Sequence, residues 1–370
     1  MLPQLLWLAP IRYARLYYMT LAVAIALAGV LVIIGRLRGY RQRVGSPGRF
    51  DDRTELSRQW LMKGLGALWL IDGFLQAQPA MFTRFTQGFL APLIIGQPKP
   101  VASIIHLGIA AWSVSPVVLD VFIIFLQIGI GLELLWGHLQ GQRVALWVSL
   151  VWGLAVWIVG EGLGGMLVGG GWFTGTPGSA LLYVLGVWAL LMPRSWWRSG
   201  SGLTWLRWTV AGLFAINALL QALPQAGWWN GGLAGYVRGM AEMPQPEVFS
   251  APLYMVSAWM GHNSALWNGV LVVGLAFFTV AFFIWPKSRA LFWLAVAWVF
   301  LSWWIGQDFG VLGGMGTDPN TGAVWLLLLF VYADRAQVVD LPHPAGHAAG
   351  KTAGVQRLRR KAKSPAGHRP

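Results

Sequence analysis

The chain has 370 residues, of which 56% are hydrophobic and only 11% are charged, with a formal net charge of +14. Soluble domains carry about 25% charged residues, so this composition excludes an ordinary soluble globular protein and indicates a protein with several membrane spans. The sequence has no cysteine, which excludes disulfides, thiol catalysis and thiolate-held metal centres.

The first predicted element is an apolar run at residues 16–35, followed by the basic sequence RLRGYRQR. A signal peptide would have a shorter apolar region and a small-residue cleavage site, so the run predicts a membrane anchor helix. Its basic flank places the following loop in the cytoplasm and the N-terminus outside. Residues 1–59 therefore form the predicted anchor and a basic cytoplasmic loop.

The rest of the apolar sequence divides into two predicted four-helix units, 60–198 and 199–335. In each unit a long outer segment follows the first span and a Gly-rich loop joins the last two. The predicted spans of the first unit are 60–77, 116–138, 144–160 and 179–192. Those of the second unit are 205–223, 264–285, 290–306 and 323–333. The remaining tail, 336–370, is basic and rich in Pro, Ala and Gly, which predicts a disordered cytoplasmic segment.

The positions of the cations support this arrangement of nine spans. Of the 27 Lys and Arg residues, the arrangement places only five outside: Arg12, Arg15, Arg84, Lys99 and Arg238. Such an asymmetry is typical of a correct topology. We therefore expect a multi-pass protein of a prokaryotic plasma (inner) membrane, with its C-terminus in the cytoplasm and many Trp residues at the lipid headgroups. The same distribution of charge beside apolar runs argues against nucleic acid as a partner.

Sequence similarity between the two units predicts an internal repeat. The stretch from Trp60 to Pro79 aligns without a gap with the stretch from Trp205 to Pro224, and the loop after Trp157 aligns with the loop after Trp303. Because each unit has an even number of spans, the two units should have the same orientation, related by an axis along the membrane normal.

The helix that opens the first unit carries a pattern of small and polar residues, and the second unit keeps only its glutamine, as Gln221. This four-span unit with a long loop after its first span resembles the DoxX/DoxD-like membrane module. The resemblance implies a tandemly duplicated module and, from some members of that family, a membrane subunit of a quinone-linked oxidoreductase. The positions that match are Gly64, Gly66, Asp72, Gly73 and Gln76.

Polar residues within spans and at the Gly-rich loops are the candidate site. A carboxylate inside a bilayer is costly and usually faces the interior of the bundle. The candidates for ligand binding or proton handling are Asp72, Gln76, Asn217, Gln221, Glu161, Gln307 and Asp308. The candidate loop residues are Gly164, Gly165, Gly310, Thr317 and Asp318. Tight turns and helix caps explain many of the same loop residues, so that interpretation stays open beside the functional one.

Two function classes follow from these residues. One is a membrane scaffold or a small-solute pathway between the two repeats, with no enzymatic activity. The other is the quinone-linked subunit that the resemblance implies, with Asp72, Gln76 and Glu161 binding the quinone or its protons. The histidines lack metal-ligand spacing, so no metal is expected. The expected partners are the lipid bilayer and, for either class, another membrane or extracytoplasmic subunit.

Overall fold

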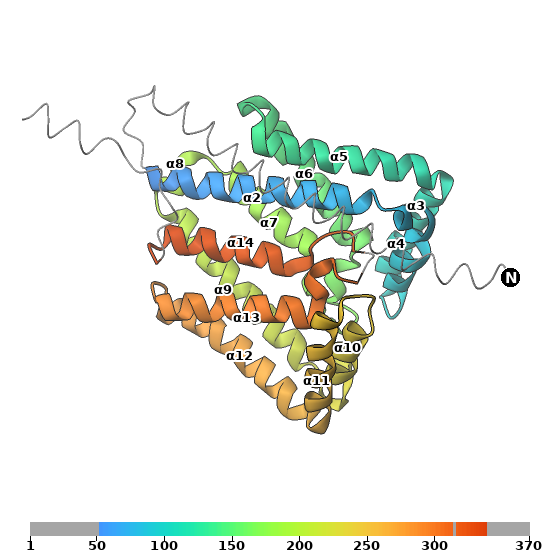
Figure 1. Ribbon diagram of the computed structural model, residues 1–370. Helices are drawn as coiled ribbons and strands as arrows, with labels where there is room; N and C mark the ends of the chain where they lie inside the picture. Colours follow the sequence, from blue (N-terminus) through green and yellow to red (C-terminus); the bar gives the residue numbers. More distant parts are fainter. Residues whose placement is uncertain (1–51, 314–315, 339–370) are drawn as a thin grey trace, which may run out of the picture.

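The structure is a computed structural model that describes residues 52–313 and 316–338, all of it helices and loops without a strand in these ranges. The predicted anchor helix at 16–35 and the tail beyond residue 338 lie outside the described residues. The helices are packed as a bundle, with most of the long ones running in the same direction or opposite to it (Figure 1). The predicted all-α fold is therefore confirmed for the described residues.

Residues 52–198 form seven α-helices and four short helical turns. Pro79, Pro92 and Pro100 begin or interrupt helices in the stretch after α2, where a 3-10 and a π turn replace a continuous helix. In chain order the elements are α2 (Asp52–Gln76), α3 (Pro79–Phe85), η1 (Thr86–Leu90), η2 (Ala91–Ile94), α4 (Lys99–Val114), α5 (Pro116–Trp136), α6 (Leu139–Ala155), η3 (Val156–Gly160), η4 (Leu163–Gly165), α7 (Ser179–Leu191) and α8 (Arg194–Arg198).

The described residues from 201 onward also form long helices joined by shorter helices and turns. Asn263 and Ser288 cap two of them, because their side chains accept hydrogen bonds from the backbone amides of Leu266 and Leu291. The elements are α9 (Ser201–Ala222), η5 (Pro224–Ala226), η6 (Trp228–Asn230), α10 (Gly232–Ala241), α11 (Glu247–His262), α12 (Ser264–Ile284), α13 (Arg289–Gln307), η7 (Asp308–Gly310) and α14 (Asn320–Arg335).

Five of these helices are long and apolar enough to cross a membrane, which agrees with an integral membrane protein. Three other predicted spans fall on α2, α7 and α14, which are not among the five. α7 has 13 residues and α14 has 16, whereas a helix needs about 20 residues to cross the membrane fully. The nine-span arrangement therefore stays a prediction. The five helices span Pro116–Trp136, Leu139–Gly160, Ser201–Ala222, Ser264–Ile284 and Arg289–Gly310.

Glycines let α2 approach its neighbours closely. A Cβ atom on Gly131 of α5 would lie 2.8 Å from the Gly66 carbonyl oxygen of α2, and one on Gly73 would lie 2.6 Å from Ile128. On another face of α2, a Cβ on Gly64 would lie 2.4 Å from Leu327 of α14. Gly64, Gly66 and Gly73 thus have a packing role, typical of helix contacts in membranes.

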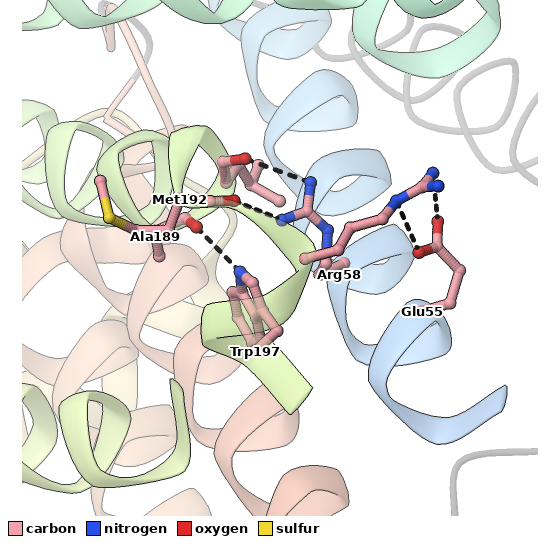
Figure 2. A network of polar contacts seen from close by, with 7 residues as sticks. Glu55, Arg58, Ala189, Met192 and Trp197 are labelled. Atoms are coloured by element: carbon pink, nitrogen blue, oxygen red, sulfur yellow. Dashed lines mark hydrogen bonds and ion pairs between the residues drawn. The ribbon is translucent and has the colours of Figure 1, made fainter. Parts of the chain in front are cut away.

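The end of the bundle where α8 lies is held by polar contacts with α2. The Arg58 guanidinium donates to the Met192 and Leu190 carbonyls, over 3.0 and 3.2 Å, and so caps the end of α7 (Figure 2). The Trp197 indole donates to the Ala189 carbonyl over 2.9 Å, and Arg194 pairs with Glu55. The opposite end of the bundle carries α3, α4, α10 and α11 and both Gly-rich loops (Figure 1).

Candidate functional site: a carboxyl cluster between the two halves

Glu161 lies directly after η3, where the first Gly-rich loop begins. Its Oε1 atom accepts a hydrogen bond from the Ser179 hydroxyl over 2.6 Å and another from the Ala180 amide over 3.0 Å. Since Ser179 and Ala180 are the first two residues of α7, Glu161 caps that helix across the whole loop. The Oε2 atom is shielded from solvent and has no hydrogen-bond partner among the described residues.

Asp318 reaches the same serine from the second half of the chain. The Ser179 hydroxyl contacts Asp318 Oδ2, and Asp318 Oδ1 accepts from the Asn320 amide over 2.7 Å. Ser179 is only 3% exposed. The two carboxyl groups, one from each half of the protein, therefore meet at one buried hydroxyl.

This geometry determines how many protons the pair carries. A serine hydroxyl has one hydrogen to donate, and its oxygen otherwise accepts. Carboxyl oxygens of Glu161 and Asp318 both lie at hydrogen-bond distance from Ser179, and the serine can donate to only one of them. This geometry favours a pair in which one carboxyl is protonated and donates to the serine oxygen while the serine donates to the other.

Burial and mutual repulsion act on both acids in the same direction. Burial, and secondarily the charge of Asp318, raise the pKa of Glu161 from 4.5 to about 7, against the opposing hydrogen bonds from Ser179 and Ala180. Burial also raises the pKa of Asp318. Because the two groups interact, their titration belongs to the pair. The pair is placed to gain or lose a proton near neutral pH.

Asp72 joins the cluster through α7. The Tyr183 hydroxyl donates to Asp72 Oδ1 over 3.3 Å, and Asp72 is 2% exposed. Tyr183 follows Ser179 by four residues on α7, so both side chains lie on one face of that helix. The predicted candidates Asp72, Glu161 and Asp318 therefore lie around a single stretch of α7.

The other predicted residues lie in separate contacts. Gln76 donates to Asp120, and Gln221 donates to Asn268 over 2.7 Å while accepting from the Trp172 amide. Asn217 donates to the Leu213 carbonyl of its own helix, over 3.0 Å. Gln76 and Gln221 tie their helices to neighbouring segments, and among the described residues none of the three amides hydrogen-bonds to the carboxyl cluster.

Asp308, the candidate acid at the start of the second Gly-rich loop, hydrogen-bonds to a different segment from Glu161. Its Oδ2 atom accepts a hydrogen bond from the Gln245 side-chain amide over 3.3 Å. Asp308 is 3% exposed, and its backbone has a left-handed conformation with φ of 46°. Gln245 lies in the connection between α10 and α11. Thr317, another loop candidate, is half-buried.

Gln307 is the structural counterpart of Glu161. Its Oε1 atom accepts from the Thr321 amide over 3.1 Å and from the Thr321 hydroxyl over 3.0 Å, and Thr321 is the second residue of α14. A tryptophan donates to a loop carbonyl in both places: Trp157 to Pro177 over 2.8 Å, and Trp303 to Pro319 over 2.7 Å. Equivalent hydrogen bonds therefore hold both loops.

Glycines in a left-handed conformation complete both loops. Gly164 and Gly165 have φ of 61° and 72°, and Gly310 has φ of 74°. A Cβ atom on Gly164 would lie 1.9 Å from the Pro177 carbonyl oxygen, and one on Gly310 would lie 2.5 Å from the Asp318 carbonyl oxygen. The close approach of two backbone segments requires glycine at Gly164 and Gly310.

Ser179 and Tyr183 were not among the residues predicted from the sequence. Ser179 is the first residue of an apolar run and was assigned only as the start of a span. Its spacing of four from Tyr183 is the one signal that places two hydroxyls on one helix face. Ser179 and Asp318 lie 139 residues apart in the chain, and no local pattern reveals a contact over that separation.

Comparisons with protein-family models, with curated proteins and with solved structures found no match. Within residues 52–313 and 316–338, no group of three or more His, Asp and Glu side chains has an arrangement that could hold a metal ion. The chemistry that the carboxyl cluster does support is the binding of a proton.

Proposed function

We propose that this integral membrane protein forms a small-solute pathway between its two halves and that passage of the solute is coupled to a proton held by Glu161, Ser179 and Asp318. The observation that carries this proposal is the single serine hydroxyl between two carboxyl groups from different halves. Carboxyl groups in the interior of membrane bundles commonly mark such pathways, and transporters built from repeats place their sites at the repeat interface.

The proton can cross between the two halves in one balanced step. The O–H bond at Asp318 breaks as a bond to the Ser179 oxygen forms, while the serine O–H bond breaks and its hydrogen bonds to Glu161 Oε1. The charge then moves from Glu161 to Asp318, and no other reactant is needed. Movement of one half relative to the other would interrupt this relay.

The proposal includes a topology. The two halves are tandem four-helix copies in the same orientation, and both Gly-rich loops face the extracytoplasmic side of a prokaryotic plasma membrane. Support comes from the equivalent capping and indole hydrogen bonds at Gln307 and Glu161, and from both loops lying at one end of the bundle (Figure 1). Cysteine substitutions at the exposed position 174 and at position 317, in a chain without native cysteine, should be labelled from outside intact cells.

Infrared difference spectroscopy on the purified protein tests the proton site. The carbonyl band of a protonated carboxyl should disappear as pH rises through neutrality, and Glu161→Gln should abolish that change. Glu242→Gln, which removes an exposed acid of the ion pair with Arg238, is the matched control and should leave the change intact. A titration that is the same in Glu161→Gln and in the wild type would contradict the site.

Proton movement is tested separately in liposomes. Ser179→Ala keeps both carboxyl groups and removes the hydroxyl that joins them, so proton uptake driven by a potassium diffusion potential and reported by an internal pH dye should fall about tenfold or more. Uptake that equals that of the wild type would remove the relay from the proposal, even if the infrared titration persists.

The quinone-linked alternative is less well supported by these contacts. The Gln76 amide is bonded to Asp120 and Asp72 to Tyr183, so both side chains of the implied quinone site have protein partners. Solvent extraction of the purified protein followed by mass spectrometry separates the two functions. A stoichiometric quinone that is lost in Asp72→Asn would favour the alternative.

A further inference from the structure

A second feature lies at the other end of the bundle, where the chain passes from the first half to the second. A wide cavity of about 520 Å³, largely open to the surface, is present at the connection between α8 and α9. Its volume is within the range of small-ligand sites. Four indole rings and three hydroxyl groups line it, among them those of Trp188, Trp205, Trp208, Ser199, Ser201 and Thr204.

The aromatic side of this cavity continues onto the lipid-facing surface. Trp208 is 59% exposed and Trp188 is 38% exposed, and the Trp188 and Trp205 rings pack with centroids 5.4 Å apart. α9 is one of the five helices able to cross a membrane, and the cavity lies at its beginning. Indole rings at the end of a span favour the level of the lipid headgroups. The cavity therefore opens where a headgroup meets its acyl chains.

The polar side of the cavity presents hydroxyl groups at the start of α9. The hydroxyls of Ser199 and Ser201 are 2.9 Å apart, and Thr204 lies almost one turn further along the helix. No side chain caps the start of this helix, and Gly200 turns the chain into it with φ of 85°. Hydroxyl donors beside a helix start suit the oxygens of a phosphate diester.

The charge around the connection is positive. Between Glu161 and Glu242 the sequence has no acidic residue, whereas Arg194 and Arg198 lie in α8. Arg194 keeps 52% of its side chain exposed while it pairs with Glu55. This excess favours a ligand with net negative charge over a zwitterionic one.

From these observations we propose that the cavity between α8 and α9 binds an anionic glycerophospholipid. The phosphate accepts hydrogen bonds from the hydroxyls of Ser201 and Thr204, while the Ser199 hydroxyl keeps its bond to the Trp196 carbonyl, and an acyl chain lies against the exposed rings of Trp208 and Trp188. The lipid then fixes the connection between the two halves from the side opposite the carboxyl cluster. This site is independent of the proposed function.

Ser201→Asp provides a test that does not depend on disrupting the fold. Aspartate at the first position of α9 favours the helix, because its charge opposes the helix dipole, but it repels a phosphate. Ser250→Asp, near the start of α11 at the other end of the bundle, is the matched control with the same change of charge. The two proteins and the wild type are purified in detergent and titrated with phosphatidylglycerol or phosphatidylcholine, and native mass spectrometry counts the bound lipid.

We expect the wild type to bind its first phosphatidylglycerol more tightly than phosphatidylcholine. Ser201→Asp should weaken that first binding about fivefold, and Ser250→Asp should leave it unchanged. Thr204→Trp, which fills the cavity, should weaken it as well. Equal binding of the two lipids, or unchanged binding in both cavity variants, would overturn the proposal. Displacement of the lipid by soluble glycerol phosphate would show a site for free phosphate esters instead.

Discussion

The two Gly-rich loops are held by equivalent hydrogen bonds but differ in one residue type that matters for chemistry. In both, a side chain at the loop start caps the next helix and an indole holds a loop carbonyl. The first loop uses the carboxyl of Glu161, whereas the second uses the amide of Gln307. An amide cannot exchange a proton with its neighbours near neutral pH. Loop geometry and proton binding are therefore separable, and only the first loop has both.

The largest expected effect tests whether the two loops share one geometry. Gly164→Ala and Gly310→Ala each place a Cβ against a backbone carbonyl oxygen, 1.9 and 2.5 Å away, at a positive φ. Each should lower the free energy of unfolding by about 3 kcal/mol, because the backbone must move and the left-handed conformation disfavours alanine. Thermal unfolding of the detergent-purified variants measures this.

Gly129→Ala is the control for those two variants. Gly129 lies within α5 and a Cβ atom there would meet nothing within 4 Å. Its effect should be neutral or stabilising, since alanine favours a helix. If Gly310→Ala were tolerated like Gly129→Ala while Gly164→Ala was not, the two loops would not be equivalent.

The next effect concerns pH. Because burial raises the pKa of Glu161 from 4.5 to about 7, the folded protein binds more protons than the unfolded chain between these values. Stability should therefore fall as pH rises from about 4.5 to 7, by roughly 1–2 kcal/mol once solvent screening of this half-buried group is allowed for. Unfolding midpoints measured across this range give the slope.

Glu161→Gln should flatten that slope, since the first loop then resembles the second. Asp318→Asn should move the pH range over which stability falls to lower values, because the neighbouring charge that helps to raise the pKa of Glu161 is removed. A wild-type stability that rises over the same range would show that Glu161 is ionised and stabilised by its hydrogen bonds.

The sequence alone predicted part of this comparison. The apolar runs predicted the helices, and the Gly-rich stretches predicted both loops, with Glu161 opposite Gln307 and Gly164 opposite Gly310. It did not distinguish Asp308 from Asp318 as the acid that approaches Glu161, because both follow the same apolar run and the choice depends on how the loop folds back. The contact of Ser179 with Asp318 is a tertiary contact, which helical periodicity cannot reveal.

The smallest expected effect on stability comes from Gln307→Glu, which gives the second loop the residue type of the first. The new carboxyl would accept the same two hydrogen bonds from Thr321 that the amide oxygen accepts now, at 3.1 and 3.0 Å. Since the first loop already holds a carboxyl in this way, the free energy of unfolding should change by less than about 1 kcal/mol at low pH, where the new group is neutral.

Infrared difference spectra of Gln307→Glu should then show a second carboxyl that titrates above the usual range of glutamate, because position 307 is only 8% exposed. In Gln307→Glu combined with Glu161→Gln, the signal should come from the second loop alone, yet proton uptake into liposomes should stay low. Within the part of the chain that the structure describes, the Thr321 hydroxyl contacts no acid, whereas the Ser179 hydroxyl contacts both Glu161 and Asp318. Restored uptake in that double variant would mean that any buried acid at either loop suffices and that the serine bridge between the halves is not what moves the proton.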